Sequence, residues 1–423
     1  MMCVNVRRAL VSAAFLSGSA FAGPATFMVL GDLANGQGGS AGLGVSADGR
    51  VVVGWADSSN GSEAFRWTSS TGMVGLGLPT DWFPEFEDSQ SFASAGTACS
   101  GDGNVVAGYV VENKNGNLKG FRWTPGTGMQ KLVEVGYNAG RAVSLDGNYI
   151  AGETYTGFLA ATGFRWSEEE GMTGIDTSGF QSLAWGISHD GSRIAGQYRA
   201  FPGQAFLWES GVGLTTLGDI PGGPEDSGAN AISGDGTTVV GFGSDNDFFA
   251  DKFQAVRWRS DTGMIGLGRL PGTRLSSAFG ASGDGNTVVG FSFSSGSSTS
   301  EKAFIWTPDG GMQDLAALLT AQGADLQGYR LNIAYAVSAD GRTIVGNASR
   351  PGRSSVAFIA RLGDSCPACI ADFNSDGGVD GSDVEAFYGV WEDGESCADV
   401  NNDGGVDGAD VEAFFAAWEG GSC

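Results

Sequence analysis

Two short loops near the C-terminus hold the side chains best suited to binding a metal ion. In each loop, oxygen-bearing side chains stand at positions 1, 3, 5, 9 and 12, and glycine stands at position 6. The glycine permits a sharp turn, and position 7 contributes its backbone carbonyl. The pattern predicts two Ca²⁺ ions, held by Asp372, Asn374, Asp376, Gly378, Asp380 and Asp383 in the first loop and by Asp399, Asn401, Asp403, Gly405, Asp407 and Asp410 in the second.

The charge around these loops agrees with bound cations. The spacing is that of an EF-hand-type loop, it recurs after 27 residues, and each copy opens a similar predicted helix. Residues 364–419 hold fifteen Asp and Glu, whereas no Lys or Arg follows Arg361. A segment so rich in carboxylates must be disordered or be neutralised by cations, and the tandem spacing favours the second.

The tandem loops resemble a type I dockerin over residues 369–423, because Asp stands at position 12 and the entering helix is missing. The resemblance implies a calcium-dependent module that binds a cohesin-like or other extracellular protein. Positions 10 and 11 depart from the larger polar pairs of cohesin-binding dockerins, since they are Gly381-Ser382 and Gly408-Ala409.

Four cysteines frame the loops: Cys366, Cys369, Cys397 and Cys423. A zinc ribbon is the alternative, but it would need a second Cys-x-x-Cys or nearby histidines. Two disulfides are the better interpretation in an exported chain, and three pairings are open. Cys99 is predicted to be a small buried residue on an inner strand.

A Ser-x-Asp-Gly motif recurs seven times in the rest of the chain, with its Asp at positions 48, 102, 146, 190, 235, 284 and 340. A glycine follows each Asp by about six residues, and a strand such as Phe121-Arg122-Trp123 comes next. Each repeat divides into four short strands with Asp-Gly and Gly-Met turns. Four strands in each repeat predict an all-β fold, a seven-bladed β-propeller, followed by the small α-helical calcium-binding module.

The seventh repeat lacks its last strand, which indicates how the ring closes. Residues 27–33 have the sequence pattern of that missing strand. We therefore expect the N-terminal strand to pair beside residues 356–360 and to remove the exposed edge. An open β-solenoid is the alternative.

The Gly-Met-x-x-Leu-Gly and Ala-Phe-x-Trp patterns resemble the extracellular repeats called HAF repeats, over residues 27–362. The histidine that names them is replaced here by Glu63, Gln204, Lys302 and Val356. The resemblance implies an extracellular location and brings no established activity.

Ligand contacts are predicted at the end of the propeller that receives the long, variable connections, because loops on a rigid scaffold usually carry binding residues. The candidates are Trp82, Phe83, Phe248 and Phe249. The alternative is that these aromatic side chains only cap the blades. A polysaccharide or a protein is the expected ligand.

The N-terminus predicts export. Arg7 and Arg8 precede a short apolar run, and Ala20-Phe21-Ala22 is a cleavage signal, so the predicted domains are residues 1–22, 23–362 and 363–423. A secreted or cell-surface protein is expected. No later segment is long and apolar enough to span a membrane, and the net charge of −25 disfavours nucleic acid as a partner.

No residue is assigned a catalytic role. His189 is the single histidine and stands in a repeat turn, and no P-loop, nucleophile elbow or zinc-protease motif occurs. The favoured function is a binding or scaffold protein whose C-terminal module mediates a protein interaction. The alternative is an extracellular polysaccharide-degrading enzyme, a hydrolase or lyase that carries a dockerin. The dockerin resemblance implies it, because dockerins often accompany such enzymes, and the variable loops hold Asp and Glu from which a carboxylate pair could come.

Overall fold

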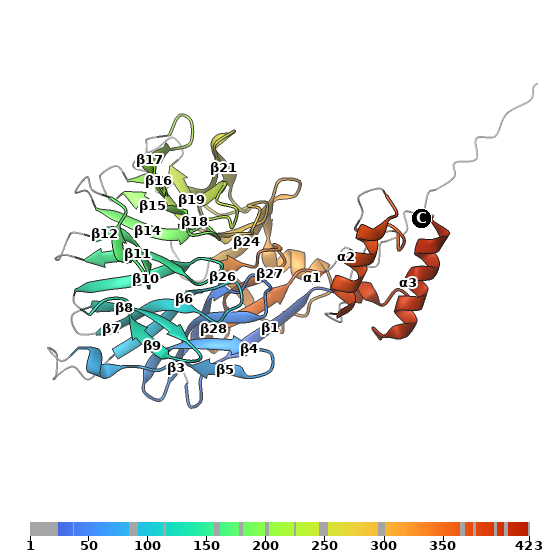
Figure 1. Cartoon of the computed structure of the whole chain (residues 1–423), viewed down its shortest axis with the longest axis horizontal. Coiled ribbons are helices and arrows are strands. Elements are labelled where there is room, and N and C mark those ends of the chain that lie inside the picture. Colours follow the sequence, from blue (N-terminus) through green and yellow to red (C-terminus); the bar gives the residue numbers. More distant parts are fainter. Residues whose placement is uncertain are drawn as a thin grey trace, which may run out of the picture. The chain divides into compact units, whose positions relative to one another are not determined.

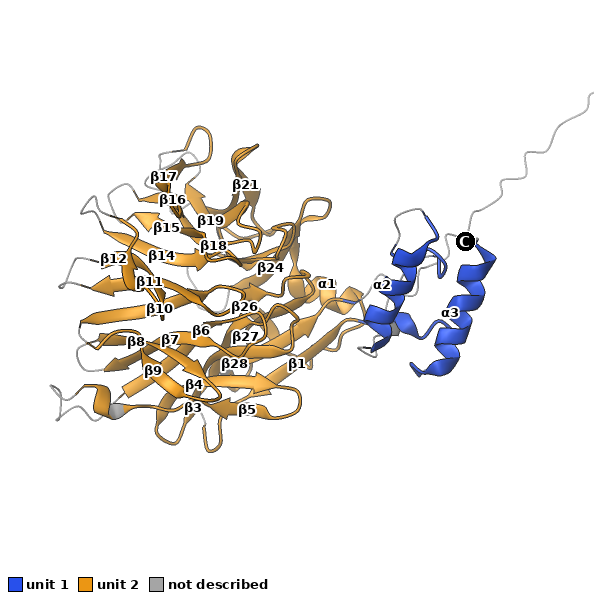
Figure 2. Cartoon of the chain, viewed as in Figure 1, with its two compact units in different colours: residues 1–24, 363–423 blue, residues 25–362 orange. Residues whose placement is uncertain are grey.

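The computed structural model describes residues 24–36, 38–83, 92–112, 116–134, 136–155, 161–176, 181–198, 203–223, 226–244, 253–294, 301–363, 369–374, 378–392, 396–401 and 405–421. The predicted signal segment, residues 1–22, lies outside this part of the chain. The chain divides into two compact units, Ala25–Leu362 and a second that contains Gly363–Cys423 (Figure 2).

In the larger unit the described strands form seven separate four-stranded antiparallel sheets (Figure 1). The first three blades contain β2 (Ser40–Val45), β3 (Val51–Ser58), β4 (Gly61–Thr68), β5 (Gly72–Gly75); β6 (Phe92–Cys99), β7 (Val106–Glu112), β8 (Asn117–Thr124), β9 (Gly128–Lys131); and β10 (Tyr137–Val143), β11 (Tyr149–Tyr155), β12 (Ala161–Ser167), β13 (Gly171–Gly174). The next three contain β14 (Ser182–Ile187), β15 (Arg193–Tyr198), β16 (Gln204–Glu209), β17 (Gly213–Gly218); β18 (Ser227–Ile232), β19 (Thr238–Ser244), β20 (Phe253–Arg259), β21 (Gly263–Gly268); and β22 (Leu275–Ala281), β23 (Val288–Phe293), β24 (Lys302–Thr307), β25 (Gly311–Asp314).

The seventh blade closes the ring with a strand from the N-terminus. Its order is β26 (Arg330–Val337), β27 (Thr343–Arg350), β28 (Arg353–Arg361) and β1 (Thr26–Gly31). Phe27 pairs with Ala360 and Val29 with Phe358 in antiparallel register. The seven-bladed propeller and the closing strand are therefore confirmed, and the open solenoid is wrong. A short helix, α1 (Leu315–Ala321), connects the sixth blade to the seventh.

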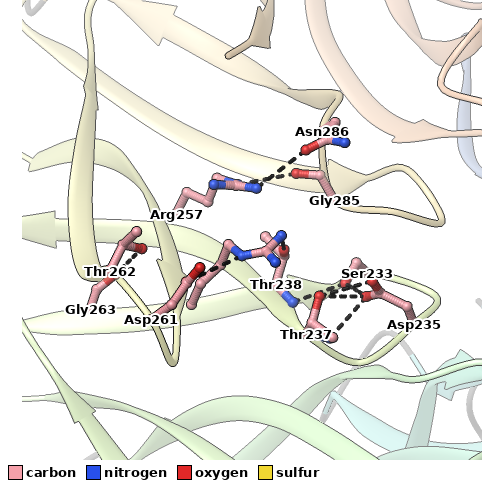
Figure 3. A network of polar contacts seen from close by, with 11 residues as sticks. Ser233, Asp235, Thr237, Thr238, Arg257, Asp261, Thr262, Gly263, Gly285 and Asn286 are labelled. Atoms are coloured by element: carbon pink, nitrogen blue, oxygen red, sulfur yellow. Dashed lines mark hydrogen bonds and ion pairs between the residues drawn. The ribbon is translucent and has the colours of Figure 1, made fainter.

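The repeated Ser-x-Asp-Gly sequence builds one turn, seen in Figure 3 for Ser233, Asp235 and Thr237. In all seven described turns the Ser hydroxyl donates to the Asp carboxylate, which also accepts the backbone N–H two residues later. The glycine is needed because its φ is positive, 69° at Gly285. A Cβ there would also lie 2.4 Å from the side chain of Thr238 in the preceding blade.

A circle of backbone hydrogen bonds joins these turns. In six of the seven turns the residue between Ser and Asp donates its N–H to the next turn, and Asp235 donates in the fifth, over distances of 2.8–3.0 Å. The last bond runs from Ala339 to Ala47 and returns to the first blade. Hydrogen bonds between blades thus explain why the turn has the same shape in each repeat. Figure 3 shows a second such contact, in which Arg257 donates to the Gly285 carbonyl.

The blade cores are built from the aromatic third strands. The Phe of that strand is fully buried in six blades, at Phe65, Phe121, Phe164, Phe206, Phe304 and Phe358, and Val256 takes its place in the fifth. The second-strand glycine lies beside this ring. A Cβ on it would come within 1.9–2.1 Å of a carbonyl oxygen of the inner strand in all seven blades, as at Gly54 and Gly196. Only glycine allows that approach.

These turns predict how the propeller responds to acid. Hydrogen bonds from Ser188 and from the Ser192 N–H hold the pKa of Asp190 at about 2, and hydrogen bonds lower the pKa of Asp102 in the same way. A depressed carboxyl pKa contributes stability that is complete above the unfolded value near 4 and is lost as pH falls through the folded value. The Tm of the propeller should therefore be nearly constant from pH 7 to 5 and fall between about pH 4 and 2.

Calorimetry at each pH measures this. Asp190→Asn should lower the Tm at pH 7. At pH 2 the difference in Tm between the variant and the parent chain should be smaller. Asp309→Asn, in another exposed turn, serves as the control. An Asp190→Asn chain whose loss in Tm is the same at both pH values would contradict the argument.

The smaller unit contains α2 (Gly381–Glu392), a 3₁₀ turn η3 (Ser396–Ala398) and α3 (Gly408–Gly420). Phe387 of α2 and Phe414 of α3 are fully buried, and their rings stack at 4.1 Å with an interplanar angle of 2°. Phe373 packs edge-on against both rings, at 5.4 and 5.8 Å. This aromatic triad is the centre of the unit's core.

Candidate functional site: a channel-end pocket and two acidic loops

The blade topology separates the turns of the propeller into two ends. The Ser-x-Asp-Gly turns and the turns between third and fourth strands lie at one end of each antiparallel blade. The connections between second and third strands, and those between blades, lie at the other end. This agrees with the arrangement expected from the sequence, and the end with the long connections is called here the variable end.

Trp82 and Phe83 were predicted to contact a ligand. Their side chains are buried instead, with 8% and 2% of their surface exposed. Trp82 is the last residue of a 3₁₀ turn, η1 (Thr80–Trp82), and Phe83 follows it. Both pack in a cluster with Val51 and Val106 of the first two blades. The ammonium group of Lys131 lies 5.7 Å from the Trp82 ring centroid. Both residues cap the blades, which was the alternative interpretation. Phe248 and Phe249 lie outside the described residues.

A different group of aromatic side chains forms a cavity of about 480 Å³. They belong to inner and second strands of blades 4, 5 and 6 and to the start of β20, and all of them are half-buried: Trp185, Phe242, Phe253, Phe279, Phe291 and Phe293. Phe279 stacks on Phe291 at 5.5 Å and 11°, and Phe242 meets Phe253 edge-on at 5.3 Å. We call this cavity the aromatic pocket.

Two of these residues reach the pocket through a feature that all blades share. Each inner strand carries a β-bulge three residues before the motif Ser, at the place where the second-strand glycine permits the close carbonyl. Bulges commonly redirect a side chain near binding sites. The seven bulged residues all line the central channel and differ in type: Leu43, Thr97, Arg141, Trp185, Asn230, Phe279 and Tyr335.

Five polar residues line the pocket beside the aromatic rings: Gln197, Asp226, Asn230, Ser276 and Ser277. The Asn230 amide donates to the Ala278 carbonyl at 2.7 Å and to the Ser277 hydroxyl at 3.1 Å. The Gln197 amide donates to the Ser227 carbonyl at 3.3 Å. Asp226 accepts the Gly203 N–H at 3.2 Å. Partial burial raises the pKa of Asp226 above its ordinary value, against the lowering effect of that hydrogen bond.

Arg141, the bulged residue of blade 3, brings a cation to the channel. Its Nε and Nη2 donate to Glu153 Oε1 at 2.8 and 2.5 Å, and its guanidinium lies 5.2 Å from the Tyr109 ring centroid. Burial alone would lower the pKa of Arg141, but the charge and hydrogen bonds of Glu153 raise it above its ordinary value. Glu153 is 1% exposed, so this cation is largely neutralised by its own partner.

His189 lies at the other end of the channel, in the circle of hydrogen-bonded turns. It is half-buried, and burial lowers its pKa against the charges of Asp235 and Asp190. Its backbone N–H donates to Gly234 and its carbonyl accepts from Leu145. His189 thus belongs to a repeat turn, as its sequence position indicates, with its side chain half-buried. Cys99 is a free thiol at the end of β6 and also lines the channel.

The two acidic loops of the smaller unit have the same internal geometry. Asp383 and Asp410, at position 12, are fully buried. Asp383 accepts the backbone N–H groups of Asn374 at 3.1 Å and Asp380 at 2.8 Å. Asp410 accepts those of Asn401 at 3.2 Å and Asp407 at 2.9 Å. The last carboxylate of each loop thus ties positions 3 and 9 together.

The loops are also linked across the unit by two tryptophans. The Trp391 indole of α2 donates to the Asp407 carbonyl at 2.9 Å, and the Trp418 indole of α3 donates to the Asp380 carbonyl at 2.8 Å. Each helix therefore braces the loop that begins the other helix. Trp391 and Trp418 were not among the predicted site residues. The sequence signal that could have identified them is their equivalent position in the two copies of the loop and helix.

Most of the predicted calcium ligands fall within the described residues, at Asp372, Asn374, Gly378, Asp380, Asp383 and at Asp399, Asn401, Gly405, Asp407, Asp410. Asp376 and Asp403, at position 5, lie outside them, and the described residues hold no group of three acidic, His or Cys side chains that could bind a metal. Cys369 and Cys397 are described, whereas Cys366 and Cys423 are not, so the disulfides stay a prediction. No described helix has the length and apolar character needed to cross a membrane.

No family model matches this sequence, and no curated protein matches it. Among solved structures, the chain is similar to the acylaminoacyl peptidase of Pyrococcus horikoshii, with 12% identity and a TM-score of 0.50 over 77% of this chain and 52% of that one. The β-propeller domain of the Trilobed protease from Pyrococcus furiosus gives 12% and 0.49 over 76% and 94%. An oligogalacturonate lyase in complex with manganese gives 12% and 0.49 over 81% and 97%. Such low identities concern the fold alone.

Proposed function

We propose that this chain is a secreted or cell-surface binding and scaffold protein. The propeller binds a ligand at the variable end, and the C-terminal unit is a calcium-dependent, dockerin-like protein-interaction module. The observation that carries the proposal is the aromatic pocket. It combines six half-buried rings with five polar residues at the variable end of blades 4 to 6. Concave, mostly apolar sites with a few polar groups are typical ligand sites.

The calcium part of the proposal rests on the chemistry of the loops. Hard carboxylate and carbonyl oxygens are the donors that Ca²⁺ prefers. Asp380 and Asp407 are exposed, and their own backbone N–H groups donate to the position-12 carboxylates of Asp383 and Asp410. The described donors therefore fit an oxygen-ligand site, with Asp372, Asn374, Gly378, Asp380 and Asp383 as ligands in the first loop and the equivalent residues in the second. Bound Ca²⁺ would neutralise these carboxylates.

A calcium titration of the full-length chain tests this part. We expect two ions per chain. Because ligand binding to the folded state alone stabilises that state, chelation should lower the Tm of the C-terminal transition and leave the propeller transition unchanged. Asp372→Ala combined with Asp399→Ala should abolish both sites.

The matched control removes the same charge from exposed helix positions, with Glu385→Ala and Glu412→Ala together. It should keep two ions. Fewer than two ions for the parent chain, or two ions in the Asp372→Ala and Asp399→Ala chain, would reject the ligand assignment.

The proposal includes the predicted export and the resemblance of the repeats to HAF repeats. Mass spectrometry of the exported chain should find a mature N-terminus at Gly23 and should find the cysteines of the module oxidised. A cohesin-like protein is the proposed partner of the module, and that interaction should require Ca²⁺.

A further inference from the structure

The hydrogen bonds within the aromatic pocket leave several acceptor atoms available to a ligand. The N–H groups of Asn230 and Gln197 are directed at protein acceptors, and Asp226 uses Oδ1 for the Gly203 N–H. Within the described part of the chain, Asn230 Oδ1, Gln197 Oε1 and Asp226 Oδ2 accept no hydrogen bond. These three acceptors, one of them on a carboxylate, are available to a ligand. The Ser277 hydroxyl also lines the pocket and can donate.

The carboxylate and the rings lie close together. A Cβ on Gly228 would lie 2.6 Å from the Phe242 ring and 3.1 Å from Gln197 Cδ. A Cβ on Gly203 would lie 2.7 Å from Gln197 Nε2 and 3.1 Å from Asp226 Oδ1. Gln197 therefore packs near both Phe242 and Asp226. The absence of a Cβ at the two glycines allows these side chains to approach the backbone closely.

Charge favours a cation as the ligand of the pocket. The whole chain has a net charge of −25. Of the cations around the pocket, Arg141 is paired with Glu153, and Arg269 donates to the Phe253 carbonyl at 3.3 Å. An anion would meet both the field of the chain and the Asp226 carboxylate. The faces of aromatic rings attract cations, most strongly when the cation leaves water. Partial burial of Asp226 disfavours its charged form in the empty pocket, and a bound cation would restore it.

We propose that the aromatic pocket binds an alkylammonium group, held between the rings of Trp185, Phe242 and Phe279 and the carboxylate of Asp226. The inference deepens the proposed ligand-binding function of the propeller and rests on it. The ammonium group can belong to a small amine or to a lysine side chain of a peptide.

The experiment is a ligand-observed NMR titration of the full-length chain with choline and with its neutral isostere 3,3-dimethylbutan-1-ol. Nα-acetyl-lysine methylamide forms a second arm, which distinguishes a peptide side chain from a free amine. Choline or the lysine derivative should bind at least about tenfold more tightly than the neutral alcohol. Asp226→Asn keeps the shape of the side chain and removes its charge, so it should abolish that difference.

Two matched controls separate the pocket from its surroundings. Asp81→Asn removes the same charge from an exposed position at the variable end, and it should leave binding unchanged. Phe279→Leu should weaken binding about threefold to tenfold, whereas Leu43→Ala, at the equivalent bulge of blade 1, should not. The propeller Tm of each variant shows that it is folded.

Equal binding of choline and the neutral alcohol would overturn the ammonium assignment, as would retention of the difference in Asp226→Asn. Binding of a neutral oligosaccharide at the same residues, without binding of either amine, would also overturn it and would leave the proposed binding function standing. Absence of binding by both amines rejects the inference, and the calcium titration still decides the module independently.

Discussion

Replacing Phe27 with alanine should lower the free energy of unfolding of the propeller by about 3 kcal/mol. Phe27 belongs to the closing strand β1 and is 9% exposed. Its ring lies 5.9 Å from Phe358 and 6.2 Å from Tyr329, so truncation leaves a cavity in the core of the seventh blade. The substitution therefore weakens the packing of β1 against β28. Urea unfolding, followed at the propeller transition, measures the change.

Met28 provides the control on the same strand. Its side chain is 43% exposed and points to the opposite face, so Met28→Ala should change the free energy of unfolding by less than about 0.5 kcal/mol. If both substitutions destabilise the propeller equally, the burial of Phe27 is not what closes the ring. If neither does, the closing strand contributes little to stability.

Phe414→Ala should remove the cooperative thermal transition of the C-terminal unit at saturating Ca²⁺. Phe414 is fully buried and stacks on Phe387, and Phe373 packs against both. Such a truncation costs about 3–5 kcal/mol, which is comparable to the whole stability of a unit with so few residues. Differential scanning calorimetry of the full chain should show the propeller transition unchanged.

Phe414→Leu keeps an apolar side chain at the same place and should retain a transition at reduced temperature. A C-terminal transition that survives Phe414→Ala at its original temperature would contradict the assignment of the aromatic triad as the core. Loss of the propeller transition in the same variant would contradict the independence of the two units.

The propeller could be predicted from the sequence because its signals are local and repeated. Ser-x-Asp-Gly dictates a turn through its own side chains, and the Phe of the third strand marks the blade core wherever it recurs. The closing strand was predictable for the same reason, since Phe27 carries the pattern that the seventh repeat lacks. Seven copies made each of these local signals reliable.

The pocket could not be predicted, because it depends on register rather than on residue type. Trp185 and Phe279 reach the channel through a bulge, and a bulge shifts the strict alternation of side chains on which strand predictions depend. The recurring glycine of the second strand was visible, but its role as the partner of the bulge follows only from the close carbonyl oxygen. The prediction of ligand contacts at Trp82 and Phe83 relied on residue type and loop length, and it missed the burial of both side chains. They occur in a long connection, and a 3₁₀ turn returns both side chains to the core.

The closing strand also decides how the propeller would bear mechanical load. The chain leaves the propeller after Arg361, which pairs with Thr343 of β27 on one side and with Thr26 of β1 on the other. A pull applied through the C-terminal segment therefore acts on an interior strand, and it must break backbone hydrogen bonds on both edges of β28 before that strand can move. The strand β1 lies at the outer edge of the blade, and the pull does not act on it directly. A propeller tethered in this way resists being unravelled from the end by which it is held.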